Sequence, residues 1–166
     1  ELAKITGLKL FHNHMTIDLI EPLFGFSPEM WRLTHLFRME IFNSFSKSDH
    51  YGMIFTKVWY FNKKEDWEDI ENICHTVSSQ GADIYFVELE ANVEERLKRN
   101  TTPHRLEYKP TKRNIEQSEQ HLLSTIESSR LNSKKGEIEK ENYLRIDNTY
   151  LSAEEVAQII KKEFHL

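Results

Sequence analysis

Two histidines and an aspartate stand close together near the start of the sequence. His12, Asn13 and His14 follow a short apolar stretch directly, and Asp18 comes four residues later. The unperturbed pKa of imidazole lies near neutrality, so histidine can exchange a proton and can donate hydrogen bonds to hydroxyl or phosphate groups. We therefore predict that His12 and Asn13 bind a small substrate and that His14 and Asp18 are catalytic groups.

Other roles for these residues remain open. Asn13 can cap a helix, His12 can be a partly buried structural residue, and Asp18 would be stabilised near a helix N-terminus whatever its function. A His-x-His pair can also bind zinc, but no further ligand stands at metal-site spacing. The sequence therefore predicts no metal site.

A basic edge is expected on the long helix that begins near residue 28. Arg32, His35 and Arg38 recur every three residues there, so they share one side of the helix. A planar guanidinium matches carboxylate and phosphate groups, and we predict that Arg32 and Arg38 bind an anionic group of the substrate. A solvated helix face would give the same pattern.

A second set of cations lies between residues 96 and 113. Residues 100–113 lack hydrophobic periodicity and are long for a simple connection, so we expect an exposed functional loop there. Positive charge on such a loop stabilises phosphate groups, although a solvated charge run is the alternative. We predict that Arg99 is catalytic. The other cations of this set are Arg96, Arg105, Lys109, Lys112 and Arg113.

The elements that must position these residues alternate between strands and helices. Runs of apolar and β-branched residues predict strands at 8–12, 51–61, 84–89 and 143–146, separated by stretches with helical periodicity. This order predicts an α/β protein, a three-layer α/β/α structure with a mainly parallel sheet. Ligands bind beyond the carboxyl ends of such strands, so Trp59 is predicted to stack on a substrate ring unless it fills the core.

Helix starts carry recognisable pairs of residues. An asparagine or serine stands three residues before a glutamate at three places, which is the spacing of a capping box. The pairs are Asn62 with Glu65, Asn92 with Glu95, and Ser152 with Glu155.

Three segments carry a resemblance to a known family. Residues 87–99 (VELEANVEERLKR), residues 144–156 (LRIDNTYLSAEEV) and residues 9–14 (KLFHNH) stand in the order of its elements. They resemble the shikimate kinase, gluconate kinase and adenylate kinase superfamily of small P-loop phosphotransferases. The resemblance covers most of the chain.

The resemblance implies a function as well as a fold. It implies a single kinase-like α/β domain over residues 1–166, a lid segment at about 100–131, and transfer of phosphate from ATP with Mg²⁺. It also implies that Arg96, Arg105 and Arg113 contact ATP and that Asp147 and Thr149 lie near the adenine. The first expected acceptor is a nucleotide or nucleoside, and the second is a sugar or a shikimate-like acid. Histidine where the family often has aspartate favours an acceptor that already carries phosphate.

The defining motif of that family is missing. No G-x-x-x-x-G-K-[ST] sequence occurs, so these residues alone provide no phosphate-cradling loop and are expected to be inactive. We expect the first strand, the loop and half of the first helix, roughly 20 residues, to lie outside the chain. That strand normally lies inside the sheet, which predicts a gap there. The alternative is a non-catalytic nucleotide-binding or regulatory domain derived from the kinase fold.

Composition and charge narrow the classes of function and partner that we expect for this chain. The net charge is -5, and no run of apolar residues approaches a membrane span, so we expect neither bulk nucleic-acid binding nor a membrane partner. The single cysteine, Cys74, indicates a reducing cytoplasm, and its place on an apolar helix face argues against a thiol or redox enzyme. A homodimer remains open.

Overall fold

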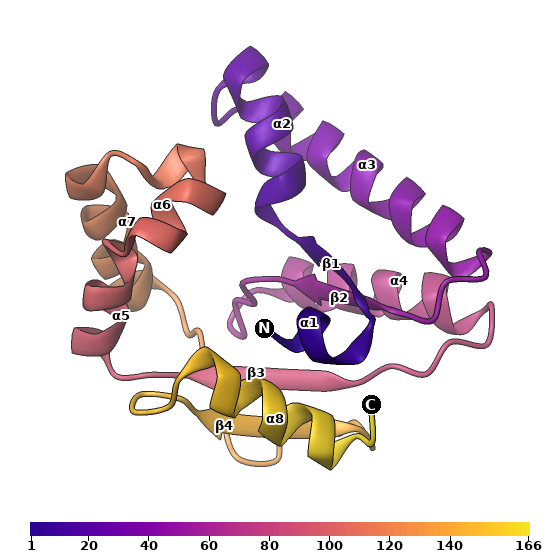
Figure 1. Cartoon of the computed structure of the whole chain (residues 1–166). Coiled ribbons are helices and arrows are strands. Elements are labelled where there is room, and N and C mark those ends of the chain that lie inside the picture. The colour runs from indigo at the N-terminus through magenta and orange to yellow at the C-terminus, as the bar shows by residue number, and fades with distance from the viewer.

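Short parallel strands alternate with helices along the chain, as the computed structural model describes for residues 1–166 (Figure 1). The strands are β1 (Lys9–His12), β2 (Met53–Thr56), β3 (Phe86–Glu90) and β4 (Tyr143–Asp147). The helices are α1 (Leu2–Thr6), α2 (His14–Phe24), α3 (Pro28–Ser46), α4 (Lys64–Ser78), α5 (Val93–Asn100), α6 (Pro103–Tyr108), the 3₁₀ turn η1 (Pro110–Lys112), α7 (Ile115–Ser128) and α8 (Ala153–Glu163). The predicted mixed α/β class is confirmed.

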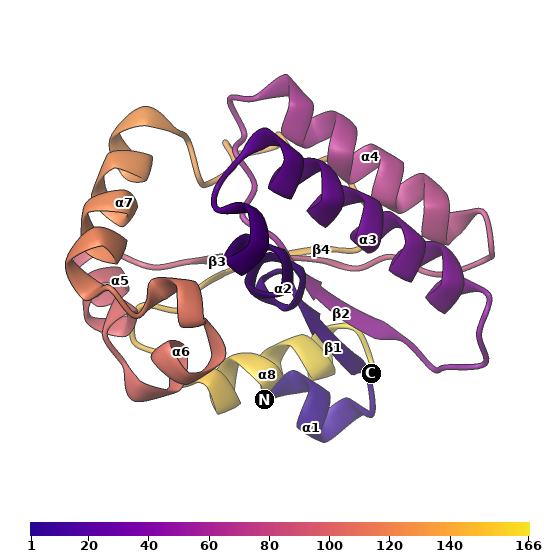
Figure 2. The same ribbon diagram turned by 90° about the horizontal axis from the view of Figure 1, so that it is seen from above.

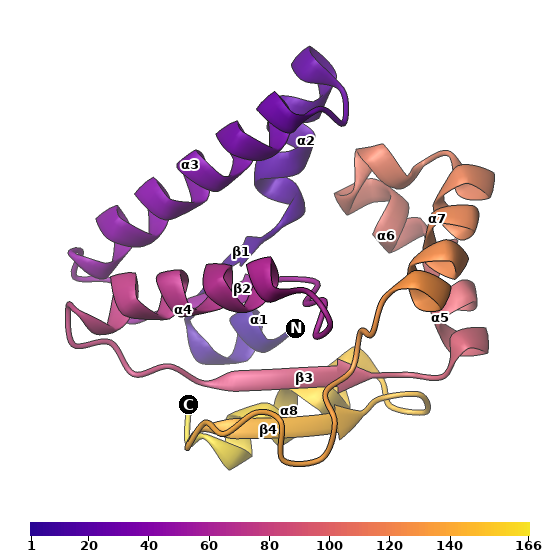
Figure 3. The ribbon, with the colours of Figure 1, turned by 180° about the vertical axis from the view of Figure 1, so that it is seen from behind.

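The strands form two separate pairs. β1 pairs with β2 in parallel, with Leu10 opposite Ile54, and β3 pairs with β4 in parallel, with Leu89 opposite Ile146. No ladder joins β2 to β3, and the two pairs lie apart in Figure 3. The strands therefore form two separate two-stranded sheets, and not the single mainly parallel sheet that the sequence predicts.

Helices flank the strand pairs on two sides. Helices α3 and α4 pack together on one side and helices α1 and α8 on the other, with the strands between them (Figure 2). Helices α5, α6 and α7 form a third group, and both β1 and β3 run toward it (Figure 1). The carboxyl ends of the two strand pairs therefore face the same group of helices.

Each strand pair has its own apolar core. Phe42 of α3 packs edge-on against Phe55 of β2 at 4.9 Å and lies 5.8 Å from Phe11 of β1, measured between ring centroids. On the other pair, Ile146 of β4 packs with Val156 and Ile160 of α8. Burial of these side chains fixes the helices on the strands because apolar surface is removed from water.

Two of the three predicted capping pairs cap a helix. Asn92 accepts a hydrogen bond from the Glu95 amide, and Ser152 and Glu155 form a complete capping box. The Asn62 pair was wrong: α4 begins at Lys64 without a side-chain cap, and Asn62 Oδ1 instead accepts from the Arg130 amide at 3.0 Å. Tertiary contact with the chain after α7 takes this side chain away from the helix.

The second strand is much shorter than residues 51–61. It ends at Thr56, and the backbone beyond it is satisfied by other parts of the molecule. The Tyr60 amide donates to Asp66 Oδ2 at 2.8 Å, and the Phe61 amide donates to the Arg130 carbonyl at 2.9 Å. Trp59 therefore lies beyond the strand, and not at its last position as predicted.

Residues 100–113 are not the structureless loop expected from the sequence. They contain α6 and η1, and a proline opens each of them, Pro103 and Pro110. Proline suits the first helical position because its missing N–H would have no partner there and its φ is already set. Short helices of this kind have too few turns to show a hydrophobic period.

The aromatic contact between α3 and the first strand pair yields a prediction. Phe42→Ala should lower the free energy of unfolding by about 3–5 kcal/mol because it leaves a cavity beside Phe11 and Phe55. Phe37, on the same helix but 45% exposed, provides the control, and Phe37→Ala should cost less than about 1 kcal/mol. Urea unfolding of both variants would measure the difference, and equal losses would contradict this packing.

Candidate functional site

A polar cluster lies where β1 ends and α2 begins. His14 is buried, and its Nδ1 lies 3.2 Å from Asp18 Oδ1. Thr111 of η1 reaches the same place: its hydroxyl donates to Asp18 Oδ1 at 2.7 Å and lies 3.3 Å from His14 Nδ1. The two predicted catalytic residues therefore lie in contact, and η1 closes over them. Thr111 was not predicted, since nothing in the sequence distinguishes this threonine.

Both histidines favour the neutral form. Burial lowers the pKa of His14, although the hydrogen bond to the Asp18 carboxylate partly offsets this effect. Burial also lowers the pKa of His12, and the charge of Lys109 lowers it further. His12 Nδ1 is buried without a hydrogen-bond partner. A neutral imidazole with a free nitrogen can accept a proton or bind a ligand hydroxyl.

Arg38 fixes the turn that carries these residues. Its Nη2 donates to the Asn13 carbonyl at 2.9 Å, and its Nε donates to Thr16 Oγ1 at 2.9 Å. Burial lowers the pKa of Arg38, and its guanidinium carbon lies 5.8 Å from the ring centre of Phe55. Arg38 thus lies at the predicted site, but two of its donors already hold the backbone. The Asn13 side chain makes no capping hydrogen bond.

A basic trio stands beside this cluster. Arg105 of α6, Lys109 and Lys112 of η1 are each about half-buried, and none of them lies within ion-pair distance of a carboxylate. Burial and the charges of Arg105 and Lys112 together lower the pKa of Lys109 to about 8. The Arg105 Nε atom is buried without a partner. These cations therefore repel one another at a place that water screens poorly.

The other predicted arginines lie elsewhere. Arg32 is exposed and pairs with Glu29 one turn away. Arg99 binds Glu95, the Asn148 side chain and the carbonyls of residues 148 and 149. Arg113 donates to the Leu106 carbonyl. The structure therefore does not bring these three to the His14 cluster, and Arg99 instead ties α5 to the loop after β4.

The loop after β4 is held by its own polar contacts. Asp147 accepts hydrogen bonds from the Thr149 amide at 2.9 Å and from the Thr149 hydroxyl at 2.6 Å. The Thr149 hydroxyl in turn accepts from the Asn92 amide at 3.0 Å. These contacts lower the pKa of Asp147 and join the ends of β3 and β4.

A cavity of about 250 Å³ lies between the chain after β2 and strand β3. Trp59 lines it, stacked on Phe61 at a ring-centroid distance of 4.7 Å, and its indole Nε1 is buried without a partner. Arg96 also lines it, and burial lowers the pKa of Arg96. Two apolar lining residues remain half-exposed, Val58 at 51% and Leu89 at 49%. Trp59 and Arg96 therefore share a site that is separate from the His14 cluster.

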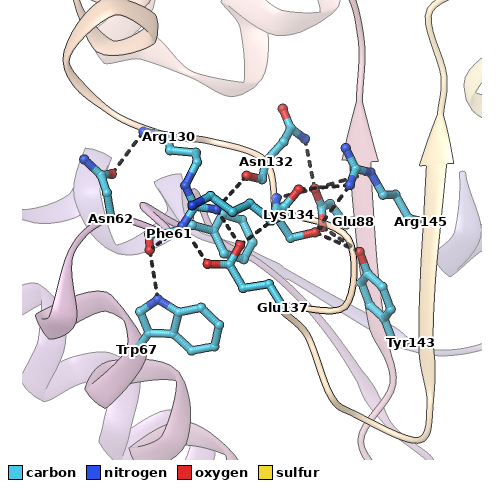
Figure 4. A network of polar contacts seen from close by, with 11 residues as sticks. Phe61, Asn62, Trp67, Glu88, Arg130, Asn132, Lys134, Glu137, Tyr143 and Arg145 are labelled. Carbon is cyan, nitrogen blue, oxygen red and sulfur yellow. Dashed lines mark hydrogen bonds and ion pairs between the residues drawn. The ribbon is translucent and has the colours of Figure 1, made fainter.

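Glu88, Asn132 and Tyr143 line this cavity and belong to a hydrogen-bond network that the sequence did not suggest (Figure 4). Glu88 of β3 accepts from the Ser133 amide and hydroxyl, from Asn132 Nδ2 and from the Tyr143 hydroxyl, at 2.6 to 3.0 Å. Burial alone would raise the pKa of Glu88, but these hydrogen bonds outweigh it and lower the pKa. The network holds the chain after α7 against the sheet.

Arg130 extends the same network toward β2. It forms an ion pair with Glu137, and its Nη2 donates to the Phe61 carbonyl at 3.0 Å (Figure 4). The Phe61 carbonyl also accepts from the Trp67 indole at 3.2 Å. Segments on either side of the cavity are thereby connected through residues 130–137.

Comparisons with models of protein families, with curated proteins and with solved structures find no match for this chain. Its class is therefore defined by its own structure, a mixed α/β protein with two parallel strand pairs.

No helix is both long enough and apolar enough to cross a membrane. No three His, Cys, Asp or Glu side chains are grouped to hold a metal ion. Cys74 is a free thiol, and burial raises its pKa.

The Glu88 network predicts a specific loss of stability. Glu88→Gln should lower the free energy of unfolding by about 1–3 kcal/mol, because the amide nitrogen cannot accept the hydrogen bonds that the carboxylate accepts. Since the folded pKa is lowered, the carboxylate stabilises the fold above its ordinary pKa and loses this effect as the pH falls through the folded pKa. Urea unfolding at pH 7 and pH 4 should show a smaller gap at pH 4. The exposed Glu94→Gln serves as the control.

The lowered pKa of Lys109 predicts an opposite pH effect. Between the folded pKa of about 8 and the ordinary value of 10.5, the unfolded chain binds more protons, so the stability of the native chain rises with pH. Lys109→Met should therefore be more stable at pH 7, by about 1–2 kcal/mol after allowance for solvent screening. This advantage should shrink toward pH 10. A constant difference across this range would contradict a buried charge at Lys109.

Proposed function

We propose that this chain forms the body of an ATP-dependent phosphotransferase that acts on a small molecule. The observation that carries the proposal is the meeting of strand ends and cations on one side of the molecule. β1 and β3 both run toward the α5–α7 group, and His14, Asp18 and the basic trio lie at that side (Figure 1). Ligands of open parallel α/β sheets bind at such ends.

The three-layer fold of a P-loop kinase requires one more strand. Its place would be between β2 and β3, where no ladder joins the two pairs and where Val58 and Leu89 leave apolar surface uncovered. A parallel strand there would be covered on both faces and would satisfy backbone groups on both sides. It would also carry the phosphate-binding loop, which these 166 residues lack.

The donor substrate would be MgATP, with its phosphates at the cavity between β2 and β3. Arg96 lines that cavity and has no carboxylate partner, so it is available to a phosphate. Mg²⁺ would arrive with the nucleotide, held by its phosphate oxygens and by the added loop. The Asp147 to Thr149 turn would approach the adenine through its backbone.

The acceptor would lie at the His14 cluster. A new bond forms between an acceptor oxygen and the γ-phosphorus while the bond to the β,γ-bridging oxygen breaks, and ADP leaves with that electron pair. If the acceptor is a hydroxyl, its proton passes to the Asp18 carboxylate or to neutral His14. Thr111 and His14 both contact Asp18 Oδ1, so the carboxylate is held in one orientation. A nucleotide or nucleoside is the first expected acceptor, and a sugar or shikimate-like acid the second.

The test is an assay of ADP release from the product of the complete reading frame, with nucleosides, nucleotides, sugars and small acids as acceptors. Asp18→Asn should lower kcat about 100-fold or more and change KM little, because it removes the proton acceptor but keeps the hydrogen bond from Thr111. Arg32→Met changes an exposed residue outside the cluster and should leave kcat unchanged.

Two outcomes would overturn the proposal. One is a reading frame that encodes no glycine-lysine phosphate loop before Glu1. The other is an intact loop without ATP-dependent transfer to any acceptor. Binding of ATP without transfer would instead support a non-catalytic nucleotide-binding domain.

A further inference from the structure

The basic trio differs from most other buried or half-buried cations of this molecule, Arg96 being the exception. Arg99 and Arg130 each pair with a glutamate, and Arg38 donates to a carbonyl and a hydroxyl oxygen. Arg105, Lys109 and Lys112 have no such partner, although each is about half removed from water. Buried charge without a partner costs stability, so a fold that retains three such groups has another use for them.

Lys109 and Lys112 flank Thr111, whose hydroxyl binds Asp18, and Arg105 lies one helical turn before Lys109 on α6, which packs against η1. Besides burial, the charge of Arg105 lowers the pKa of both lysines, and the charge of Lys112 lowers that of Lys109 as well. The charge of the Asp18 carboxylate partly offsets the lowering of the pKa of both lysines, but this carboxylate already accepts a hydrogen bond from Thr111. The buried Nδ1 of His12 and the buried Nε of Arg105 have no hydrogen-bond partner.

The charges of this place define the ligand. Three cations against the single Asp18 carboxylate leave a surplus of two positive charges, and the neighbouring histidines favour the neutral form. A phosphate monoester carries between −1.5 and −2 charges near pH 7 and offers three strong acceptor oxygens. A carboxylate would neutralise only half of the surplus. Guanidinium and ammonium donors bind phosphate oxygens well.

We propose that Arg105, Lys109 and Lys112 bind the phosphate group of a phosphorylated small molecule between η1, α6 and the end of β1. If the proposed phosphotransferase activity is correct, this molecule is the acceptor, because the trio lies beside Asp18 and not at the cavity that Arg96 lines. The cations expected to act together on ATP therefore divide into two sets. One serves the donor, and the other selects an acceptor that already carries phosphate.

The test uses inorganic phosphate as the probe and the thermal unfolding of this chain as the readout. Phosphate should raise Tm by roughly 5 °C at about 100 times its dissociation constant, because it binds only the folded state. Lys109→Met combined with Lys112→Met should be more stable without phosphate, yet should bind phosphate at least about 30-fold more weakly. Arg105→Met provides an independent variant with the same expected loss of binding.

Two controls separate binding from simple screening of repulsion. Lys135→Met removes an exposed lysine that forms no side-chain hydrogen bond or ion pair, and this variant should respond to phosphate as the native chain does. Sodium chloride at the same ionic strength should raise Tm much less than phosphate does. An equal rise with chloride, or a full phosphate response in the double variant, would overturn the site.

Calorimetry then distinguishes the sources of the phosphate group. Tighter binding of a nucleoside monophosphate than of inorganic phosphate would identify a nucleotide acceptor, and tighter binding of a sugar phosphate would identify a sugar acceptor. Phosphate binding by this chain, together with no transfer from ATP by the product of the complete reading frame, would support this site and reject the phosphotransferase. Transfer to unphosphorylated acceptors by a chain that does not bind phosphate would reject this site alone.

Discussion

The division of the strands into two separate parallel pairs constrains how the rest of the chain can pack. A parallel pair of four or five residues per strand leaves an edge of unpaired backbone groups on each strand, and parallel sheets are stable mainly when both faces are covered. The two pairs are covered by helices, but the space between β2 and β3 is bridged only by side chains and by residues 130–137. Only 18 of 166 residues are buried, so the apolar core around the two strand pairs is small.

Local signals in the sequence predicted the elements but not their lengths. The capping residues Asn92 and Ser152 act through the nearest turn of helix, so sequence spacing alone identifies them. The end of β2 could not be predicted in this way. Residues 57–61 are apolar enough for a strand, but their backbone groups bind Asp66 and Arg130, six and about seventy residues away in sequence. Long-range hydrogen bonds of this kind leave no periodic pattern.

In the candidate site, too, the contact within one helix was predictable from the sequence, whereas the long-range contacts were not. His14 and Asp18 are four residues apart at the start of a helix, so their contact follows from helical geometry and was predictable. Thr111 and the basic trio reach them only because α6 and η1 fold back toward α2. For the arginines, the sequence does not distinguish a guanidinium group that binds a ligand from one that binds the protein backbone. Two nitrogen atoms of Arg38 and all three of Arg99 donate hydrogen bonds within the protein, whereas the buried Nε of Arg105 has no partner.

The unpaired cations Lys109 and Lys112 lower the stability of the region around η1. Lys109 and Lys112 raise the energy of the closed arrangement in which Thr111 binds Asp18, because burial and mutual repulsion both oppose their charges. An anion bound between the two lysines would offset their repulsion. Lys109 and Lys112 would then favour the contact between Thr111 and Asp18 when the anion is bound and oppose this contact when the anion is absent. A ligand shifts an equilibrium only through such a difference in affinity between two states. The repulsion within the basic trio would thus couple the position of η1 to the presence of a phosphate group between η1, α6 and the end of β1.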